Sequence, residues 1–190
     1  DSGQVSPYKL CQHWADGIDV RLSSPMTQSR FENFDAIILA CGVAAKDFIP
    51  SLPIHTVRGQ VVQASATSVS AALKTNLCYG GYIGSPEKGL HAAGSTFQKW
   101  LDNTEVSDND TRDILDHLSH DVPGLGLRHV TGARASLRCA AQDRFPVIGS
   151  VPGHDGLYVS TAHGSHGIVS SLAGAHLIAD QIEGGILSLP

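Results

Sequence analysis

Gly156-Leu-Tyr-Val-Ser-Thr-Ala-His-Gly-Ser-His-Gly167 joins an apolar strand pattern to a helical one, and this junction decides the fold class. Residues 167–182 carry apolar side chains at helical spacing, and Gly184-Gly185 ends the pattern. A strand, a glycine-rich turn and a helix start together favour negative charge, because free backbone N–H groups point out of the first helical turn. We therefore expect an α/β layer with an anion-binding turn.

The same turn also has a plainer interpretation, in which its glycines serve only the geometry of the chain. A reduced flavin, a phosphate or a carboxylate would each suit the free N–H groups, and the residues alone do not choose among them. His163 and His166 could form a metal pair, but no third ligand is evident. We expect both histidines to make hydrogen bonds within the turn, and we predict no metal site.

Arg138 lies upstream of this turn, inside the mostly apolar strand pattern of residues 130–140. Burial of an arginine is costly unless its charge is paired. The planar guanidinium matches a carboxylate, so the partner is either the carboxylate of a substrate or an internal Asp or Glu. The residues leave these two alternatives open.

Apolar patterns along the rest of the chain indicate a mixture of strands and helices. Residues 34–42 form an apolar run that ends in small residues, which is typical of a buried parallel strand. Ser107 is expected to cap a helix that ends at Pro123-Gly124. Further strands are expected over residues 9–23 (two short strands around a turn at residues 15–17), 57–66, 77–83, 90–95 and 130–140.

The composition argues against some classes of partner and location. The formal net charge of the 190 residues is −5, so bulk charge does not attract nucleic acid. No apolar run is long enough to span a bilayer, and the chain starts without a signal-peptide pattern and without methionine, which suggests a fragment or a processed chain. The cysteines have no zinc-ligand spacing, so we expect reduced, mostly buried thiols and a cytoplasmic protein: Cys11, Cys41, Cys78 and Cys139.

Three segments, taken in order, resemble the D-amino-acid-oxidase-like family of FAD-dependent oxidoreductases. They are the strand Ile37-Ile-Leu-Ala-Cys-Gly42, the pair Leu137-Arg138 followed by Asp143-Arg-Phe-Pro-Val-Ile-Gly149, and the turn His163-Gly-Ser-His-Gly167 with its helix. Cys139 departs from the proline found in many members. The G-x-G-x-x-G turn that holds the FAD pyrophosphate is not found, because Gly80-Gly-Tyr-Ile-Gly84 does not fit its spacing.

The middle of the chain narrows the resemblance to one branch of the family. The segments Arg58-Gly-Gln60, Leu77-Cys-Tyr-Gly-Gly-Tyr82 and Gly94-Ser-Thr-Phe97 look like the oxidase domain that acts on the wobble uridine of tRNA and is fused to a methyltransferase. Only the later part of that oxidase domain is matched. The partners implied are FAD, tRNA or a small amino acid, the missing first half of the oxidase, and possibly a methyltransferase domain, with no membrane.

The resemblance implies a mixed α/β fold, in which an FAD-binding α/β layer carries an inserted, mainly antiparallel substrate-domain sheet. Residues 1–43 would be a partial FAD-binding domain, residues 44–141 the substrate domain, and residues 142–190 the returning FAD-binding segment with the C-terminal helix.

The resemblance also implies roles for particular residues. Arg138 is expected to be the catalytic and substrate-binding residue that clamps a substrate carboxylate. Tyr79 and Tyr82 are expected on the substrate side, although at least one of them is expected only to pack on its neighbours. FAD is expected to lie against Ala40, Gly42, His163, Gly164, Ser165, His166, Gly167 and Ile168.

The activity implied is removal of the carboxymethyl group from 5-carboxymethylaminomethyl-(2-thio)uridine at the tRNA wobble position. Hydride would pass from the N–CH2 carbon to the flavin, and hydrolysis of the resulting imine would release glyoxylate. Two alternatives stay open. One is an FAD-dependent oxidase of a small free amino acid such as glycine, sarcosine or a D-amino acid, and the other is a non-catalytic fragment that acts only with a partner.

Overall fold

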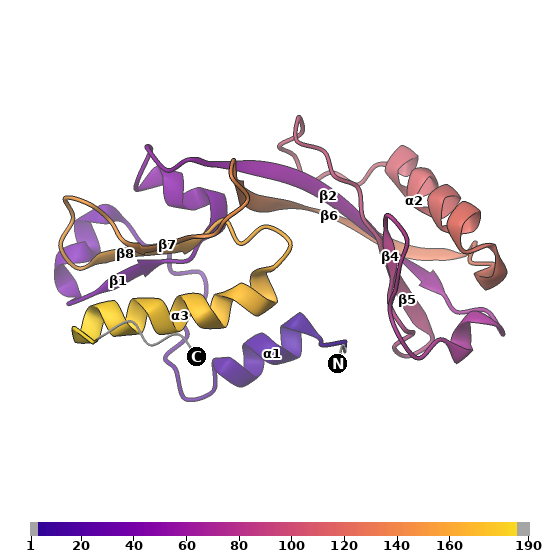
Figure 1. Cartoon of the computed structure of the whole chain (residues 1–190), viewed down its shortest axis with the longest axis horizontal. Helices are drawn as coiled ribbons and strands as arrows, with labels where there is room; N and C mark the ends of the chain where they lie inside the picture. The colour runs from indigo at the N-terminus through magenta and orange to yellow at the C-terminus, as the bar shows by residue number, and fades with distance from the viewer. Residues whose placement is uncertain (1–3, 186–190) are drawn as a thin grey trace. The chain divides into compact units, whose positions relative to one another are not determined.

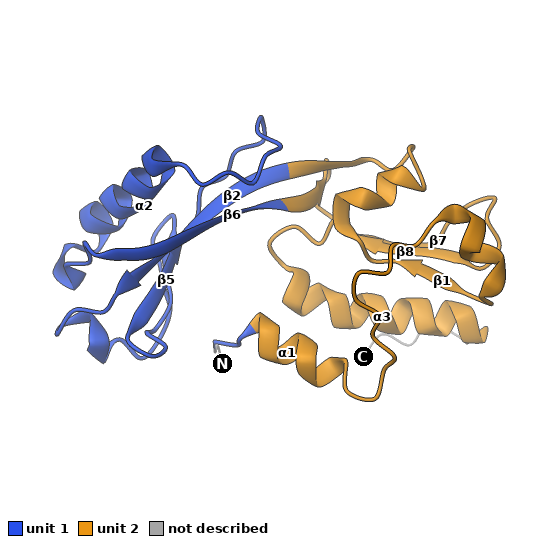
Figure 2. Cartoon of the chain, turned by 180° about the vertical axis from the view of Figure 1, so that it is seen from behind, with its two compact units in different colours: residues 1–6, 57–137 blue, residues 7–56, 138–190 orange. Residues whose placement is uncertain are grey.

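The computed structural model describes residues 4–185 and contains two compact units (Figure 2). Unit 1 comprises residues 1–6 and 57–137, and unit 2 comprises residues 7–56 and 138–190. Each unit has a sheet of its own, so the predicted mixed α/β fold is confirmed. The assignment of the segments 1–43, 44–141 and 142–190 to FAD-binding and substrate domains stays a prediction.

Unit 2 is built on a three-stranded sheet with the order β1-β8-β7. Strand β1 (Ile37–Leu39) pairs parallel with β8 (Leu157–Thr161), which pairs antiparallel with β7 (Val147–Ser150). Helix α3 (Gly167–Glu183) runs along the sheet (Figure 1). It lies close to β7 because Gly174 has no side chain, and a Cβ there would stand 2.9 Å from Cδ1 of Ile148.

Among residues 4–185, three more helices belong to unit 2. They are α1 (Pro7–Trp14), η1 (Gln28–Asn33) and η2 (Gly42–Asp47). Of these, η1 and η2 contribute Phe31 and Ala45 to its core. Aliphatic residues from β1, η2 and β8 meet the ends of two long strands, β2 (Ile54–Ser65) and β6 (Val130–Ala141). The buried residues of this core are Leu39, Ala45, Ile49, Leu52, Ile54, Ala141, Val151, Leu157, Val159 and Ala162.

Unit 1 is built on a five-stranded sheet with the order β3-β4-β5-β2-β6. The strands are β2 (Ile54–Ser65), β3 (Leu77–Cys78), β4 (Tyr82–Ile83), β5 (Leu90–Gly94) and β6 (Val130–Ala141). Neighbouring strands pair antiparallel from β3 to β2. The short helices η3 (Ser70–Ala72) and η4 (Pro123–Leu125) lie in its loops.

Helix α2 (Asp108–Asp121) supplies the second half of the unit 1 core. Its N-cap is Ser107, whose hydroxyl accepts a hydrogen bond from the N–H of Asp110 at 3.3 Å, as the sequence predicts. Ile114 and Leu118 lie on the buried face of α2 and belong to one cluster with apolar residues of β2, β4 and β5. This cluster is separate from the core of unit 2.

The predicted strands in residues 9–23 are wrong. Pro7 begins helix α1, a position that suits proline because the first helical N–H has no partner to lose. The alternating residues Ile18, Val20 and Leu22 are exposed instead of forming a strand. Alternation alone does not make a strand when no neighbouring strand offers a ladder of hydrogen bonds.

The predicted strand over residues 77–83 is interrupted. A bend separates β3 from β4 at residues 79–81, where a Cβ on Gly81 would stand 2.7 Å from the carbonyl oxygen of Gly94. The cysteines are free as expected, but they are not mostly buried, because Cys11, Cys41 and Cys78 are exposed.

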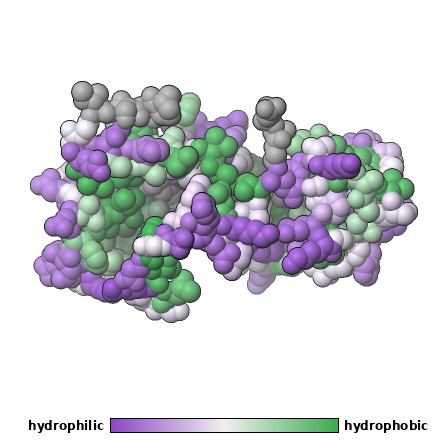
Figure 3. Space-filling view, turned by 90° about the horizontal axis from the view of Figure 1, so that it is seen from below, coloured by the Kyte–Doolittle hydropathy of each residue, from purple (hydrophilic) through white to green (hydrophobic). Residues whose placement is uncertain are grey.

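Unit 2 leaves many apolar side chains in contact with solvent. Ile38 on β1 is 48% exposed, and Val169 and Leu172 on α3 are 80% and 53% exposed. Figure 3 shows apolar surface lying open among polar groups on one face of the molecule. Within residues 4–185, no helix is long and apolar enough to cross a membrane.

Candidate functional site

The turn after β8 is anchored to two other segments of unit 2. Ala162 is buried and has a positive φ of 59°, a conformation that costs energy in a residue with a Cβ. The hydroxyl of Thr161 donates to the carbonyl oxygen of Gly42 at 3.0 Å, and the N–H of Gly164 donates to that of Cys139 at 3.1 Å. These two bonds join the turn to the first residue of η2 and to β6.

His163 is held inside this turn by hydroxyl groups. Its Nδ1 lies 2.8 Å from Oγ of Ser170, and its Nε2 lies 3.1 Å from Oγ of Ser160. Burial lowers the pKa of the imidazole, which favours the neutral ring. Both ring nitrogens therefore have protein partners, as expected for a hydrogen-bonding residue of the turn.

The start of α3 presents unused backbone donors. The N–H groups of Gly164, His166 and Val169 donate to carbonyls within unit 2. Those of Ser165, Gly167 and Ile168 have no backbone acceptor among residues 4–185. Three free donors at a helix N-terminus suit an anion or an electron-rich ring edge.

The segments that carry the sequence resemblance meet at this turn. Gly42 has a positive φ of 64°, and a Cβ there would lie 3.8 Å from Cβ of Cys139. Arg138 precedes Cys139 on β6 and is half-buried, less than the sequence pattern suggests. Ala40 is exposed at the end of β1. Residues 40–42, 138–139 and 161–164 are therefore neighbours, and their predicted roles toward FAD and a substrate acid stay predictions.

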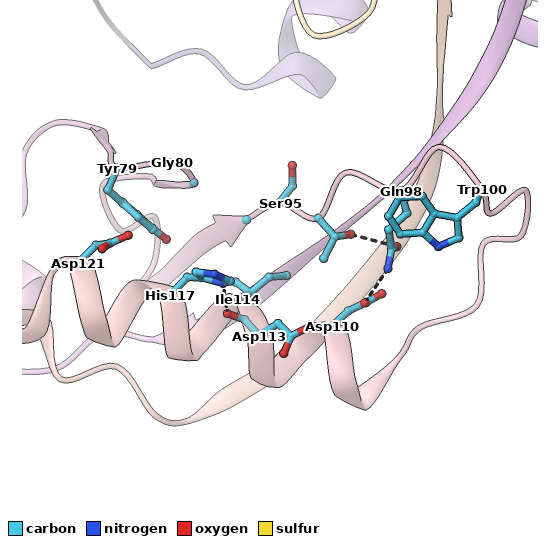
Figure 4. Close-up of a pocket in the computed structure, with 13 residues that line it drawn as sticks. Tyr79, Gly80, Ser95, Gln98, Trp100, Asp110, Asp113, Ile114, His117 and Asp121 are labelled. Carbon is cyan, nitrogen blue, oxygen red and sulfur yellow. Dashed lines mark hydrogen bonds between the residues drawn. The ribbon is translucent and has the colours of Figure 1, made fainter.

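The two tyrosines lie in unit 1 and differ in their surroundings. Tyr82 is on β4, opposite Gly94 of β5. Tyr79 lies in the bend before β4 and faces α2 near Asp121 (Figure 4). Burial, followed by the charge of Asp121, raises the pKa of Tyr79. Tyr79 thus packs beside a helix, and the substrate role of both tyrosines stays a prediction.

A cavity of about 480 Å³ lies beside α2 (Figure 4). Tyr79 lines it near the C-terminal end of the helix, and Gln98 and Trp100 line it near the N-terminal end. Two of its carboxylates already have partners in the protein. Asp110 pairs with Arg58 at 2.6 Å, and Asp121 lies 2.8 Å from Nδ1 of His120. Of the three carboxylates that line the cavity, Asp110 and Asp121 therefore have partners in the protein, and Asp113 is the third.

Among residues 4–185, the fully buried arginine is Arg58, which lies in a segment that carries the family resemblance but was not expected to be buried. It is 1% exposed, and besides Asp110 its guanidinium donates to side-chain oxygens of Gln98 and Gln60 and to the carbonyl of Glu105. Gln60 in turn bonds Ser107 and Thr111. The Arg58-Gly-Gln60 segment thus connects the start of α2 to β2 through hydrogen bonds. The sequence signal for this buried network is a pair of polar residues inside an apolar strand pattern.

Comparison with known proteins gives one family. Residues 1–181 match the family described as DAO, FAD dependent oxidoreductase. The bifunctional tRNA 5-methylaminomethyl-2-thiouridine biosynthesis protein MnmC of Idiomarina loihiensis is 32% identical over 82% of this chain and 26% of its own length. MnmC of Pseudomonas paraeruginosa is 29% identical over the whole chain and 37% of its own length. The chain thus spans only 26% to 37% of the length of these relatives.

Solved oxidases share the fold. Glycine oxidase from Geobacillus kaustophilus has a TM-score of 0.71 at 25% identity, with 82% of this chain and 43% of that chain covered. Iminodiacetate oxidase from Chelativorans sp. BNC1 has a TM-score of 0.72 at 21% identity, with 83% and 44% covered. At 21% identity, the likeness to iminodiacetate oxidase shows a shared fold and nothing further.

Proposed function

The chain belongs to the DAO family of FAD-dependent oxidoreductases, and from this premise we propose that it forms the ring-binding and substrate-binding part of an amine oxidase. The observation that carries the proposal is the turn after β8. It leaves the N–H groups of Ser165, Gly167 and Ile168 free at a helix start, beside the β6 segment that carries Arg138. No strand–glycine turn–helix unit of the pyrophosphate-binding kind lies within residues 4–185.

The donors of the turn fit a flavin ring. FAD, when bound, supplies the two-electron acceptor for oxidation of a carbon–nitrogen bond. Ser165, Gly167 and Ile168 would hold the electron-rich side of the ring through backbone N–H groups, and the positive end of α3 adds to that attraction. Ala40 and Gly42 are small, so they leave room for the cofactor beside the turn.

Arg138 would bind the acid group of the substrate. Its guanidinium can donate two parallel hydrogen bonds to one carboxylate, which orients the adjacent methylene. Because the cofactor takes the electrons, this part of the site needs no strong base from the chain. Replacing Arg138 should therefore weaken catalysis through lost orientation and lost binding of the acid.

The substrate we propose is the carboxymethylaminomethyl group of the tRNA wobble uridine. The MnmC relatives and the Leu77–Tyr82 segment support this choice. Two electrons and two protons, one proton from carbon and one from nitrogen, would leave the N–CH2 group, and the electrons would go to the acceptor that FAD supplies when bound. Water then adds to the resulting C=N bond, and the C–N bond breaks to give glyoxylate and the aminomethyl nucleoside. Tyr79 and Tyr82 belong to this proposal as residues on the substrate side.

A small free amino acid is the second candidate substrate, favoured by the likeness to glycine oxidase. Nucleoside mass spectrometry of carboxymethylaminomethyl-tRNA, incubated with FAD and the complete oxidase of which we propose this chain to be a part, separates the two. Conversion to the aminomethyl nucleoside, with no ammonia released from glycine, is expected. Oxidation of glycine with the tRNA left unchanged would contradict the tRNA assignment.

Binding of the flavin ring has a direct test in the chain itself. Lumiflavin carries the ring without the pyrophosphate, so it probes only the part of the site proposed here. Its fluorescence is expected to be quenched as the purified chain is added. Quenching that is absent up to millimolar protein contradicts the ring-binding role and supports the alternative of a fragment that needs a partner.

A further inference from the structure

His163 connects a strand to a helix across the candidate turn. Ser160, which approaches Nε2, is on β8, and Ser170, which approaches Nδ1, is in the first turn of α3. The backbone of His163 also forms a bridge with Ala140 of β6. The imidazole thus connects β8 to α3 through hydrogen bonds.

The hydrogen bonds of Ser170 decide which nitrogen of His163 carries the proton. The Ser170 hydroxyl donates to the carbonyl oxygen of His166 at 2.9 Å. A hydroxyl has a single hydrogen, so toward His163 the same oxygen accepts, and Nδ1 must carry a hydrogen. In the neutral ring Nε2 is then the acceptor, and it receives the hydroxyl hydrogen of Ser160.

We infer that Ser170 is a positioning residue, which fixes His163 as the neutral Nδ1–H tautomer and thereby keeps residues 163–167 in the shape that leaves the turn's N–H groups free. The ring of His163 is a support for the turn, because both nitrogens are used within the protein. The claim that this turn shape helps to bind flavin rests on the proposed function. The claim that Ser170 sets the tautomer of His163 and the shape of the turn does not, so the two claims can be tested separately.

Histidine 15N NMR of the purified, flavin-free chain tests the tautomer. In the unchanged chain, Nδ1 of His163 is expected to be protonated and Nε2 unprotonated. Ser170→Ala removes the acceptor of Nδ1–H, so the ring is expected to populate the Nε2–H form, with shifted amide signals at Ser165, Gly167 and Ile168. Ser170→Thr keeps the hydroxyl and is expected to retain the original tautomer.

Ser171→Ala is the matched control, because its hydroxyl makes only a long bond of 3.5 Å to the carbonyl of Ile168. It is expected to leave His163 unchanged. Ser160→Ala removes the partner of the other ring nitrogen, Nε2. This variant tests the tautomer even if Ser170→Ala does not fold. It is expected to change the Nε2 signal while Nδ1 stays protonated, because the Nδ1 bond remains.

Lumiflavin binding supplies the second measurement. Ser170→Ala is expected to weaken binding about fivefold to tenfold, the effect of one lost hydrogen bond, and Ser171→Ala is expected to leave it unchanged. An Nε2–H tautomer in the unchanged chain, or a Ser170→Ala variant with unaltered tautomer and amide signals, overturns the inference. Unweakened lumiflavin binding beside altered signals would uphold the inference about Ser170 and count against the proposed role of the turn in flavin binding. Altered signals with no lumiflavin binding in any variant would also uphold the inference and reject the proposed function.

Discussion

At the scale of the residue, Tyr79 shows how a neighbouring helix alters a side chain. Burial is the first cause that raises the pKa of its phenol, and the negative charge of Asp121 is the second. Asp121→Asn removes only the second cause, so the pKa should fall but stay above the ordinary value of 10.0. An ultraviolet titration of the phenolate measures this, and Asp116→Asn, on the same helix, is the control. A pKa unchanged by Asp121→Asn contradicts the arrangement.

His163 makes a prediction about pH and stability. Burial lowers its pKa in the folded chain, so the unfolded chain takes up a proton first as the pH falls below about 6.5. Its contribution to stability is therefore complete above that pH, declines as the pH falls, and levels off below the folded pKa. Urea unfolding of the unchanged chain and of His163→Gln, compared from about pH 8 to pH 5, should show a difference that shrinks on acidification. A difference that grows would show that the ring is held charged.

At the scale of the element, the attachment of α2 to β2 rests on Arg58 and Asp110. Their side chains are only 2% and 9% exposed, and Nε of Arg58 is a buried donor without a partner in the described structure. Arg58→Ala leaves the Asp110 charge unpaired and should cost about 3–5 kcal/mol of unfolding free energy. Chemical denaturation measures the loss. Arg112→Ala, an exposed change on the same helix, should stay within about 0.5 kcal/mol.

A double-mutant cycle measures the interaction free energy between Arg58 and Asp110. If the cost of Arg58→Ala comes from the stranded carboxylate, adding Asp110→Ala should cost less than the sum of the two single changes. Strict additivity would mean that the buried arginine acts through its packing alone.

The elements differ in how well their sequences predict them. Helices α2 and α3 were predictable because a cap or a glycine end and a helical apolar face are local signals. Helix α1 was not predicted, because the alternation at residues 18–22 favoured a pair of short strands over residues 9–23, and those residues have no partner strand in the described structure. The turn at residues 163–167 was expected from its glycines, whereas the Ser160–His163–Ser170 bonds depend on β8 and α3 folding together. The burial of Arg58 likewise depends on Asp110, which lies 52 residues away.

At the scale of the whole molecule, the chain carries two cores and covers under half of the solved oxidases that it resembles. Strands β2 and β6 contribute residues to both units. The buried side chains nevertheless form two separate clusters, one in each unit. Stability in such a chain need not be uniform, because each core can open at its own free energy.

Separate cores predict separate responses to a core substitution. Leu118 of α2 is 1% exposed in the unit 1 core, and Ile178 of α3 is 2% exposed in unit 2. Leu118→Ala and Ile178→Ala should each cost about 2–5 kcal/mol, because each leaves a cavity. Amide hydrogen exchange should then accelerate in β5 for Leu118→Ala and in β8 for Ile178→Ala, with little change in the other sheet. Equal acceleration in β5 and β8 for both variants would show that the two units open as one cooperative body through β2 and β6.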